Sequence, residues 1–465
     1  MDTLLGEALH SALQAPLYHL LLECFLVLWI LRLVFFKSYK ISSKVRLTEK
    51  EKDDLVEDWE PEPLVPPLEE TLKTSKKYRL VSGRPGKMIT IDGKTCLNFA
   101  SMNFLGLLGN KRIEEKSEEC IRHYGVGSCG PRGFYGTIDV HLELEDRLAK
   151  FMCAEKAIIY SYGFATIASA IPAYSKRGDI LYVDEAVCFP IQKGVQASRS
   201  KVVYFKHNDL DDLEEKLQEQ AKLDKKNPKK ASVTRKFMVV EGIYMNTGEL
   251  VDLPRLVELK YKYKVRLIVE ESMSFGVLGD YGRGVTEHYN VPISKVDIVC
   301  ASLEYSLGSI GGFCCGRSYV INHQVLSGQG YVFSASLPPV MSRASVEGLN
   351  ILEEDPGVFS QLRSKASKFQ DLLSGIPSIE LLGYHESASF HIRRSNPVSI
   401  TEDTAWLEDV VEKCSDHGLC LTLASRLNEE ELNQQWPPSI RISVSVHMDD
   451  EDLQKAADII REVTQ

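Results

Sequence analysis

The 465 residues of the chain carry a net charge of -10, and 44% of them are hydrophobic and 26% charged. This composition excludes a collagen-like or largely disordered chain, and the acidic balance argues against a general nucleic-acid-binding protein. The length favours a large domain with a smaller one. The 11 cysteines show no C-x-x-C spacing and no Cys/His cluster. This pattern predicts a reducing compartment and no structural metal.

The first predicted element is an apolar helix over residues 16–37. It is long enough for about 30 Å of hydrocarbon, and we interpret it as a single transmembrane helix, with a monotopic surface helix as the alternative. Lysines and arginines follow it, which predicts a lumenal N-terminus over residues 1–15 and a cytosolic body. His19 and Glu23 share one helix face and can bond each other or a second helix, whereas Arg32 lies opposite Glu23.

Residues 38–90 are predicted to form an acidic linker and an N-terminal arm. Beyond them, short β-rich runs alternate with helical stretches, which is typical of a mostly parallel sheet with helices on both faces. The runs are Ala157–Tyr160, Val202–Phe205, Phe237–Val240, Arg266–Val269 and Ile298–Ala301. We expect a large domain over residues 91–345 and a small α+β domain over residues 346–465. The run Lys222–Lys236 is interpreted as a solvated loop, with a lipid-facing patch as the alternative.

Four segments carry the candidate chemistry, and their order along the chain is the strong signal. Residues 124–136 are rich in glycine, and residues 160–166 open a helix whose free N–H groups can receive a phosphate. Glu270 and Glu271 end a buried strand, where carboxylates are costly unless they have partners. Residues 302–312 end in two glycines. Taken singly, residues 124–136 suit a tight structural loop equally well, residues 160–166 suit an ordinary strand-to-helix turn, and Glu270 and Glu271 suit a cap of the next turn.

In this order, the segments resemble the α-oxoamine synthases, pyridoxal-phosphate enzymes that condense an amino acid with an acyl-CoA. Further matches are Asn103–Gly106, His207–Asp209, Glu241–Gly248, Phe333–Pro339 and Arg441. The resemblance implies a fold-type I PLP-transferase large domain. The apolar helix, the acidic linker and the loop Cys129–Gly136 are similar to the serine palmitoyltransferase branch, which makes 3-ketosphinganine, CoA and CO2 from L-serine and palmitoyl-CoA.

The chain departs from this family at the positions that carry its chemistry. Active members hold the cofactor through a lysine in a Thr-x-x-Lys pattern, and here that position is Tyr305. Cys188 stands where a histidine stacks on the cofactor ring, and Met273 stands at a second histidine position. A phenol cannot form an imine, and Met273 has no proton to exchange. We therefore expect this chain to be inactive alone.

The resemblance also implies that part of the chain completes the active site of a partner. Ser334 and Ser336 are expected to bind the phosphate of the partner's cofactor, with strand-end capping as the alternative. The loop containing Cys129, Arg132 and Tyr135 is expected at the interface, beside that site.

The expected function is that of a required, non-catalytic subunit of a heteromeric acyltransferase in the endoplasmic reticulum membrane. The resemblance implies pyridoxal 5'-phosphate bound covalently by the lysine of a catalytic partner, of the kinds named subunit 2 or 3. Small membrane-bound activating and regulatory subunits and membrane lipid are further expected partners. The alternatives are an independent homodimeric enzyme with an unrecognised base, and a membrane scaffold without a role in condensation.

Overall fold

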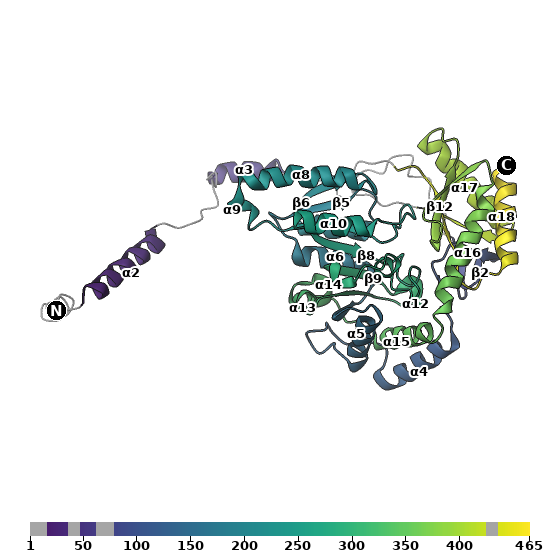
Figure 1. Cartoon of the computed structure of the whole chain (residues 1–465), viewed down its shortest axis with the longest axis horizontal. Coiled ribbons are helices and arrows are strands. Elements are labelled where there is room, and N and C mark those ends of the chain that lie inside the picture. Colours follow the sequence, from purple (N-terminus) through teal and green to yellow (C-terminus); the bar gives the residue numbers. More distant parts are fainter. Residues whose placement is uncertain (1–15, 36–46, 62–78, 425–435) are drawn as a thin grey trace. The chain divides into compact units, whose positions relative to one another are not determined.

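The computed structural model describes residues 16–35, 47–61, 79–424 and 436–465 (Figure 1). The chain divides into two units, Met1–Lys77 and Tyr78–Gln465. In the first unit, α2 spans Leu17–Phe35 and α3 spans Glu49–Glu57. A capping box starts α3, because the Thr48 hydroxyl accepts a hydrogen bond from the Glu51 N–H while the Glu51 carboxylate accepts one from the Thr48 N–H.

The prediction of a transmembrane helix over residues 16–37 is not supported. Within the described ranges, no helix is both long and apolar enough to cross a membrane. Helix α2 has 19 residues, and Glu23 and Arg32 interrupt its apolar surface. His19 Nδ1 lies 3.6 Å from Glu23 Oε1, as their spacing predicts. The predicted lumenal segment, the basic residues at 36–46 and residues 62–78 of the predicted linker lie outside the described residues.

The second unit is built on a seven-stranded sheet with the order β4-β10-β9-β8-β7-β5-β6. Its strands are β4 (Lys156–Tyr160), β5 (Ile180–Asp184), β6 (Lys201–Phe205), β7 (Lys236–Glu241), β8 (Arg266–Glu270), β9 (Ile298–Ser302) and β10 (Gly312–Gly316). Strand β10 pairs antiparallel with both neighbours, and the pairs from β9 to β6 are parallel. The predicted mostly parallel sheet is therefore confirmed, and its strands are almost wholly buried except for the edge strand β6, which is largely half-buried.

Helices pack around this sheet and connect its strands (Figure 1). They are α4 (Lys111–Tyr124), α5 (Asp139–Phe151), α6 (Gly163–Tyr174), α7 (Phe189–Ser198), α8 (Leu210–Lys226), α9 (Pro228–Ala231), α10 (Leu253–Tyr263), α11 (Val285–His288), α12 (Glu304–Leu307), α13 (Ser318–Ser327), α14 (Gln329–Val332) and α15 (Pro339–Glu354). A 3-10 turn, η2, spans Ile293–Lys295. Helix α15 runs through residue 345, where the sequence places the domain boundary.

Two four-stranded sheets complete the unit, with orders β11-β12-β15-β14 and β1-β2-β3-β13. Their elements are β1 (Val81–Ser82), β2 (Met88–Ile91), β3 (Lys94–Asn98), β11 (Ile379–Leu382), β12 (Ser389–Arg394), β13 (Leu419–Cys420), β14 (Thr422–Leu423) and β15 (Ile440–Ser443), with helices α16 (Gly357–Ser374), α17 (Ile400–Asp416) and α18 (Asp450–Thr464). Leu97 of β3 pairs with Leu419 of β13. The N-terminal arm thus joins the C-terminal part of the chain in one sheet.

Candidate active site

Acidic side chains gather at the carboxyl ends of the central strands. Strand β5 ends at Asp184, β7 at Glu241 and β8 at Glu270. Glu241 and Glu270 are paired directly across the two strands. Ligands of open α/β sheets bind outside this edge, so we place the candidate site here.

A small cavity of about 180 Å³ lies at this edge. Cys188 precedes α7, Glu270 ends β8 and Tyr305 lies on α12, and all three line the cavity beside residues 162–164 at the start of α6. The structure thus brings together three positions that their motifs assign to one site. Met273 is instead buried in the main hydrophobic core, with 2% of its surface exposed.

Tyr305 is held in place by its backbone and its ring. Its carbonyl accepts a hydrogen bond of 3.0 Å from the Phe104 N–H, and the two rings pack edge to face with centroids 6.3 Å apart. Burial raises the pKa of the phenol above its usual value, so Tyr305 is neutral at physiological pH. A neutral phenol can donate a hydrogen bond, but it cannot form the imine that the lysine amine forms in active family members.

Glu241 and Glu270 form a buried acidic pair beside the cavity. Glu241 accepts hydrogen bonds from the N–H groups of Cys188 at 2.7 Å and Met245 at 3.0 Å. Glu270 accepts from the N–H of Ser272 at 3.1 Å and from its hydroxyl. Burial, together with the charge of Glu270, raises the pKa of Glu241 to about 8. Burial raises the pKa of Glu270 to about 7, so both acids titrate near neutral pH.

The same cluster has the composition of a metal site. One ligand atom each from Cys188, Glu241 and Glu270 lies within 4.8 Å of the others. Both carboxylates are already satisfied by amide and hydroxyl donors, however, and this arrangement requires no cation.

Glu271 acts as a cap and not as a cavity residue. Its carboxylate accepts hydrogen bonds from the Ser274 hydroxyl and from the Val285 N–H at 3.0 Å. It is fully buried, and burial raises its pKa to about 7. The capping alternative is therefore the correct one for Glu271.

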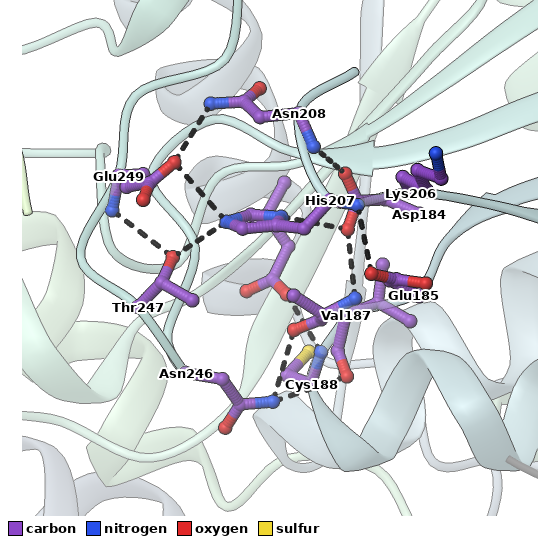
Figure 2. A network of polar contacts seen from close by, with 12 residues as sticks. Asp184, Glu185, Val187, Cys188, Lys206, His207, Asn208, Asn246, Thr247 and Glu249 are labelled. Atoms are coloured by element: carbon purple, nitrogen blue, oxygen red, sulfur yellow. Dashed lines mark hydrogen bonds and ion pairs between the residues drawn. The ribbon is translucent and has the colours of Figure 1, made fainter. Parts of the chain in front are cut away.

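A histidine network fixes the loop between β5 and α7 (Figure 2). His207 Nδ1 lies 2.9 Å from Asp184 Oδ1, and its Nε2 lies 3.0 Å from the Thr247 hydroxyl and 3.4 Å from Glu249. Burial disfavours the charged ring, but hydrogen bonds to Asp184 and Glu249 outweigh it and raise the pKa of His207 to about 9. The imidazolium therefore neutralises Asp184, which is fully buried.

Asn246 links the same loop to the turn that follows β7. Its amide donates to the carbonyls of Ala186 at 3.1 Å and Val187 at 3.2 Å, directly before Cys188 (Figure 2). The network thus fixes the position from which Cys188 faces the cavity.

The segments expected to face a partner lie against each other. The Ser336 N–H and hydroxyl both donate to the Gly130 carbonyl at 3.0 Å, and the Ser128 hydroxyl donates to the Ser336 carbonyl at 3.0 Å. Ser334 Oγ lies 2.9 Å from Ser161 Oγ. Ser336 is thus buried and bonded within the chain, while Ser334 is half-buried.

Arg132 lies inside the loop and not on its outer surface. Its guanidinium makes two hydrogen bonds to Glu145, at 2.8 and 3.1 Å, and a third to the Thr137 hydroxyl at 3.0 Å. Only 5% of its side chain is exposed, and it lies over the Tyr331 ring. Arg132 therefore stabilises its own loop, and the expected contact with a partner's charged site is not supported.

Exposed aromatic side chains cover the outer surface of these segments. Tyr135 is fully exposed, and Phe134 and Phe333 are 66% and 81% exposed. Cys129 is exposed too, and it adopts a φ of 62° that strains most side chains. Exposed aromatic side chains are enriched at protein interfaces.

The chain is similar to known proteins in both sequence and fold. The family model for class I and II aminotransferases matches residues 94–460. "Serine palmitoyltransferase 1" of Dictyostelium discoideum is 42% identical over 96% of this chain and 94% of that protein. "Long chain base biosynthesis protein 1c" of Oryza sativa subsp. japonica is also 42% identical, over 96% of this chain and 91% of that protein.

The chain belongs to the serine palmitoyltransferase 1 and long chain base biosynthesis protein 1 family. A solved structure of Sphingomonas wittichii serine palmitoyltransferase superposes with a TM-score of 0.72, covering 81% of this chain and 89% of that one. At 22% identity, this likeness shows a shared fold, and the matching family model identifies it as that of the class I and II aminotransferases.

The cavity residues do not fit a covalently held pyridoxal phosphate. The residues that line the cavity all lie within the described ranges, and none of them is a lysine. The cavity volume of about 180 Å³ is also smaller than the roughly 300–1,000 Å³ of most ligand sites. At the start of α6, Glu304 Oε1 lies 3.5 Å from the point where a Cβ on Gly163 would stand. This carboxylate places negative charge where a phosphate would bind.

Sequence reasoning missed the roles of Glu241 and His207. Both stand in motifs that the sequence connects to the site only through the family resemblance. The available signal for Glu241 was an acid directly after the β-rich run Phe237–Val240, the same pattern that marked Glu270.

Proposed function

We propose that this chain is a required, non-catalytic subunit of a heteromeric serine palmitoyltransferase. The complex condenses L-serine with palmitoyl-CoA to 3-ketosphinganine, CoA and CO2, the first step of sphingolipid biosynthesis. The names of the relatives and the shared fold support the reaction. One observation carries the non-catalytic role: Tyr305 lines the cavity at the position of the lysine, with Cys188 and Glu304 beside it.

The partner in this proposal is a subunit of the same fold that bears the lysine, of the kinds named subunit 2 or 3. Pyridoxal phosphate held there supplies the electron sink for the condensation. This chain contributes the surface formed by Phe134, Tyr135 and Phe333, with Ser334 beside it as a donor toward the partner's phosphate. Small activating and regulatory subunits belong to the same proposal. The exposed aromatic side chains support a large partner surface.

We place the complex at the endoplasmic reticulum membrane, with the sheet domain in the cytosol. The long-chain product favours a membrane location, because each buried methylene stabilises membrane binding by about 0.8 kcal/mol. Microscopy of a tagged chain tests this location, and a signal confined to another compartment contradicts it.

The decisive experiment reconstitutes the enzyme from separate subunits. The chain is purified alone, the lysine-bearing subunit is purified alone, and the two are co-expressed, and serine-dependent CoA release is measured for all three. We expect release only from the co-expressed pair. Release from this chain alone supports an independent enzyme, and full release from the partner alone supports a scaffold.

A further inference from the structure

The amino edge of the central sheet has the opposite charge to the edge that forms the cavity. Strand β6 begins at Lys201, β7 at Lys236 and β8 at Arg266. Lys201 and Lys236 both pair with Ile180 of β5, and Arg266 pairs with the residue after Lys236, so the three basic residues lie at the same edge. The acids Asp184, Glu241 and Glu270 end strands of the same sheet. The sheet therefore separates an acidic, cavity-bearing edge from a basic one.

Five lysines form what we call the basic edge. They lie at the start of β6, at the end of α8 and on α9, and are Lys201, Lys225, Lys226, Lys229 and Lys230 (Figure 1). All five are exposed, and none has an ion-pair partner in the part of the chain that the structure describes. In a chain with a net charge of -10, this is a local excess of positive charge.

A hollow of about 410 Å³ opens between these lysines. Lys201, Lys226 and Lys230 line it together with the apolar side chains of Ile180 and Leu223. Asp224 also lines it, but its carboxylate accepts hydrogen bonds from Lys236 at 2.6 Å and from the Gln220 amide at 2.7 Å. The hollow therefore presents three positive charges that no local acid balances.

Two exposed apolar side chains flank the lysines. Leu223 is 52% exposed and Val233 is 76% exposed. Lysines interleaved with apolar side chains suit a bilayer surface, where cations meet anionic head groups and apolar groups enter the boundary with the acyl chains. A nucleic acid would use the cations alone, and the net negative charge of the chain opposes it.

We propose that the basic edge docks on a membrane surface that contains anionic phospholipid, with one head-group phosphate in the hollow. Docking through the amino edge leaves the carboxyl edge, with Tyr305 and the acidic pair, free of the bilayer. The inference does not depend on the proposed function, because it uses none of the residues at that site.

The test measures partition of the full chain onto vesicles of phosphatidylcholine with and without about 30% phosphatidylserine. The ratio of the two partition coefficients isolates the contribution of negative head groups. The test variant changes Lys201, Lys226, Lys229 and Lys230 to Gln. The control variant removes four other exposed lysines without ion pairs, Lys111, Lys150, Lys264 and Lys455, by the same substitution. Circular dichroism and thermal unfolding verify that both variants are folded.

We expect the test variant to lower the ratio at least about tenfold, and the control variant to change it less than about twofold. Equal ratios for the test variant and the unchanged chain would overturn the proposal. Binding of millimolar inorganic phosphate by a chain that shows no preference for the phosphatidylserine vesicles would also overturn it, because the hollow would then select soluble phosphate and not a membrane. Replacing Leu223 and Val233 with Gln is expected to weaken binding to the phosphatidylserine vesicles further.

Discussion

The protonation of Glu241 gives the stability of the chain a specific dependence on pH. Burial and Glu270 raise the pKa of Glu241 from its usual 4.5 to about 8. The unfolded state has released this proton by about pH 6, whereas the folded state still binds it. The stabilisation is thus fully present below about pH 4.5 and is lost as the pH rises through about 8, with roughly 3 kcal/mol lost between about pH 6 and 9.

The substitution Glu241→Gln removes this titration. A neutral amide has one acceptor oxygen, so either the Cys188 N–H or the Met245 N–H loses its partner, at a cost of about 1–3 kcal/mol. We therefore expect the variant to be less stable than the unchanged chain at about pH 6 and to approach or exceed its stability at about pH 9. Urea unfolding of the full chain at the two pH values measures the difference.

Glu380→Gln is the matched control. Glu380 pairs with Arg393 at 2.8 Å, and this hydrogen bond lowers the pKa of Glu380 below its usual value. Its substitution is expected to change stability equally at both pH values. If the Glu241→Gln variant and the unchanged chain lose stability in parallel as the pH rises, Glu241 is not a protonated buried acid and the reasoning about the acidic pair fails.

Three further predictions concern single side chains. Arg132→Ala leaves the nearly buried carboxylate of Glu145 without its cation, so denaturant unfolding should show a loss of about 3–5 kcal/mol in the free energy of unfolding. The control Arg393→Ala should lose about 1 kcal/mol or less, and similar losses for the two variants would contradict the role given to Arg132. Tyr305→Phe should change CoA release by the assembled complex less than about twofold, and a large loss would give the phenol a chemical role. A larger side chain at Cys129 should alter the amino-acid selectivity of the complex, whereas the same change at Cys153, also exposed and with positive φ, should not; unchanged selectivity at Cys129 would count against the interface.

The sequence predicts those parts of the fold that local patterns determine. The β-rich runs of the central sheet could be read because buried parallel strands are continuous and apolar. Strand β10 has the sequence Gly-Phe-Cys-Cys-Gly, which lacks β-branched residues, and it forms because β4 and β9 supply its hydrogen bonds on both sides. The pairing of β3 with β13 joins distant parts of the chain, and no local pattern indicates it.

The candidate site shows the same division. The order of the motifs predicts that Cys188, Glu270 and Tyr305 share one site, and they line one cavity. Arg132 was misplaced because its partner Glu145 lies on the following helix, and only the folded loop shows that the two side chains meet in the interior. The bond between His207 and Asp184 likewise depends on neighbouring strands lying in register.

The central claim is that this chain belongs to the enzyme without holding its cofactor. The most direct test reduces the assembled, active complex with borohydride, which fixes pyridoxal phosphate to the amine that binds it, and then locates the label by peptide mass spectrometry. We predict label on a lysine of the partner and none on this chain. A pyridoxyl group on any lysine of this chain, at a level comparable with the partner's, would contradict the account.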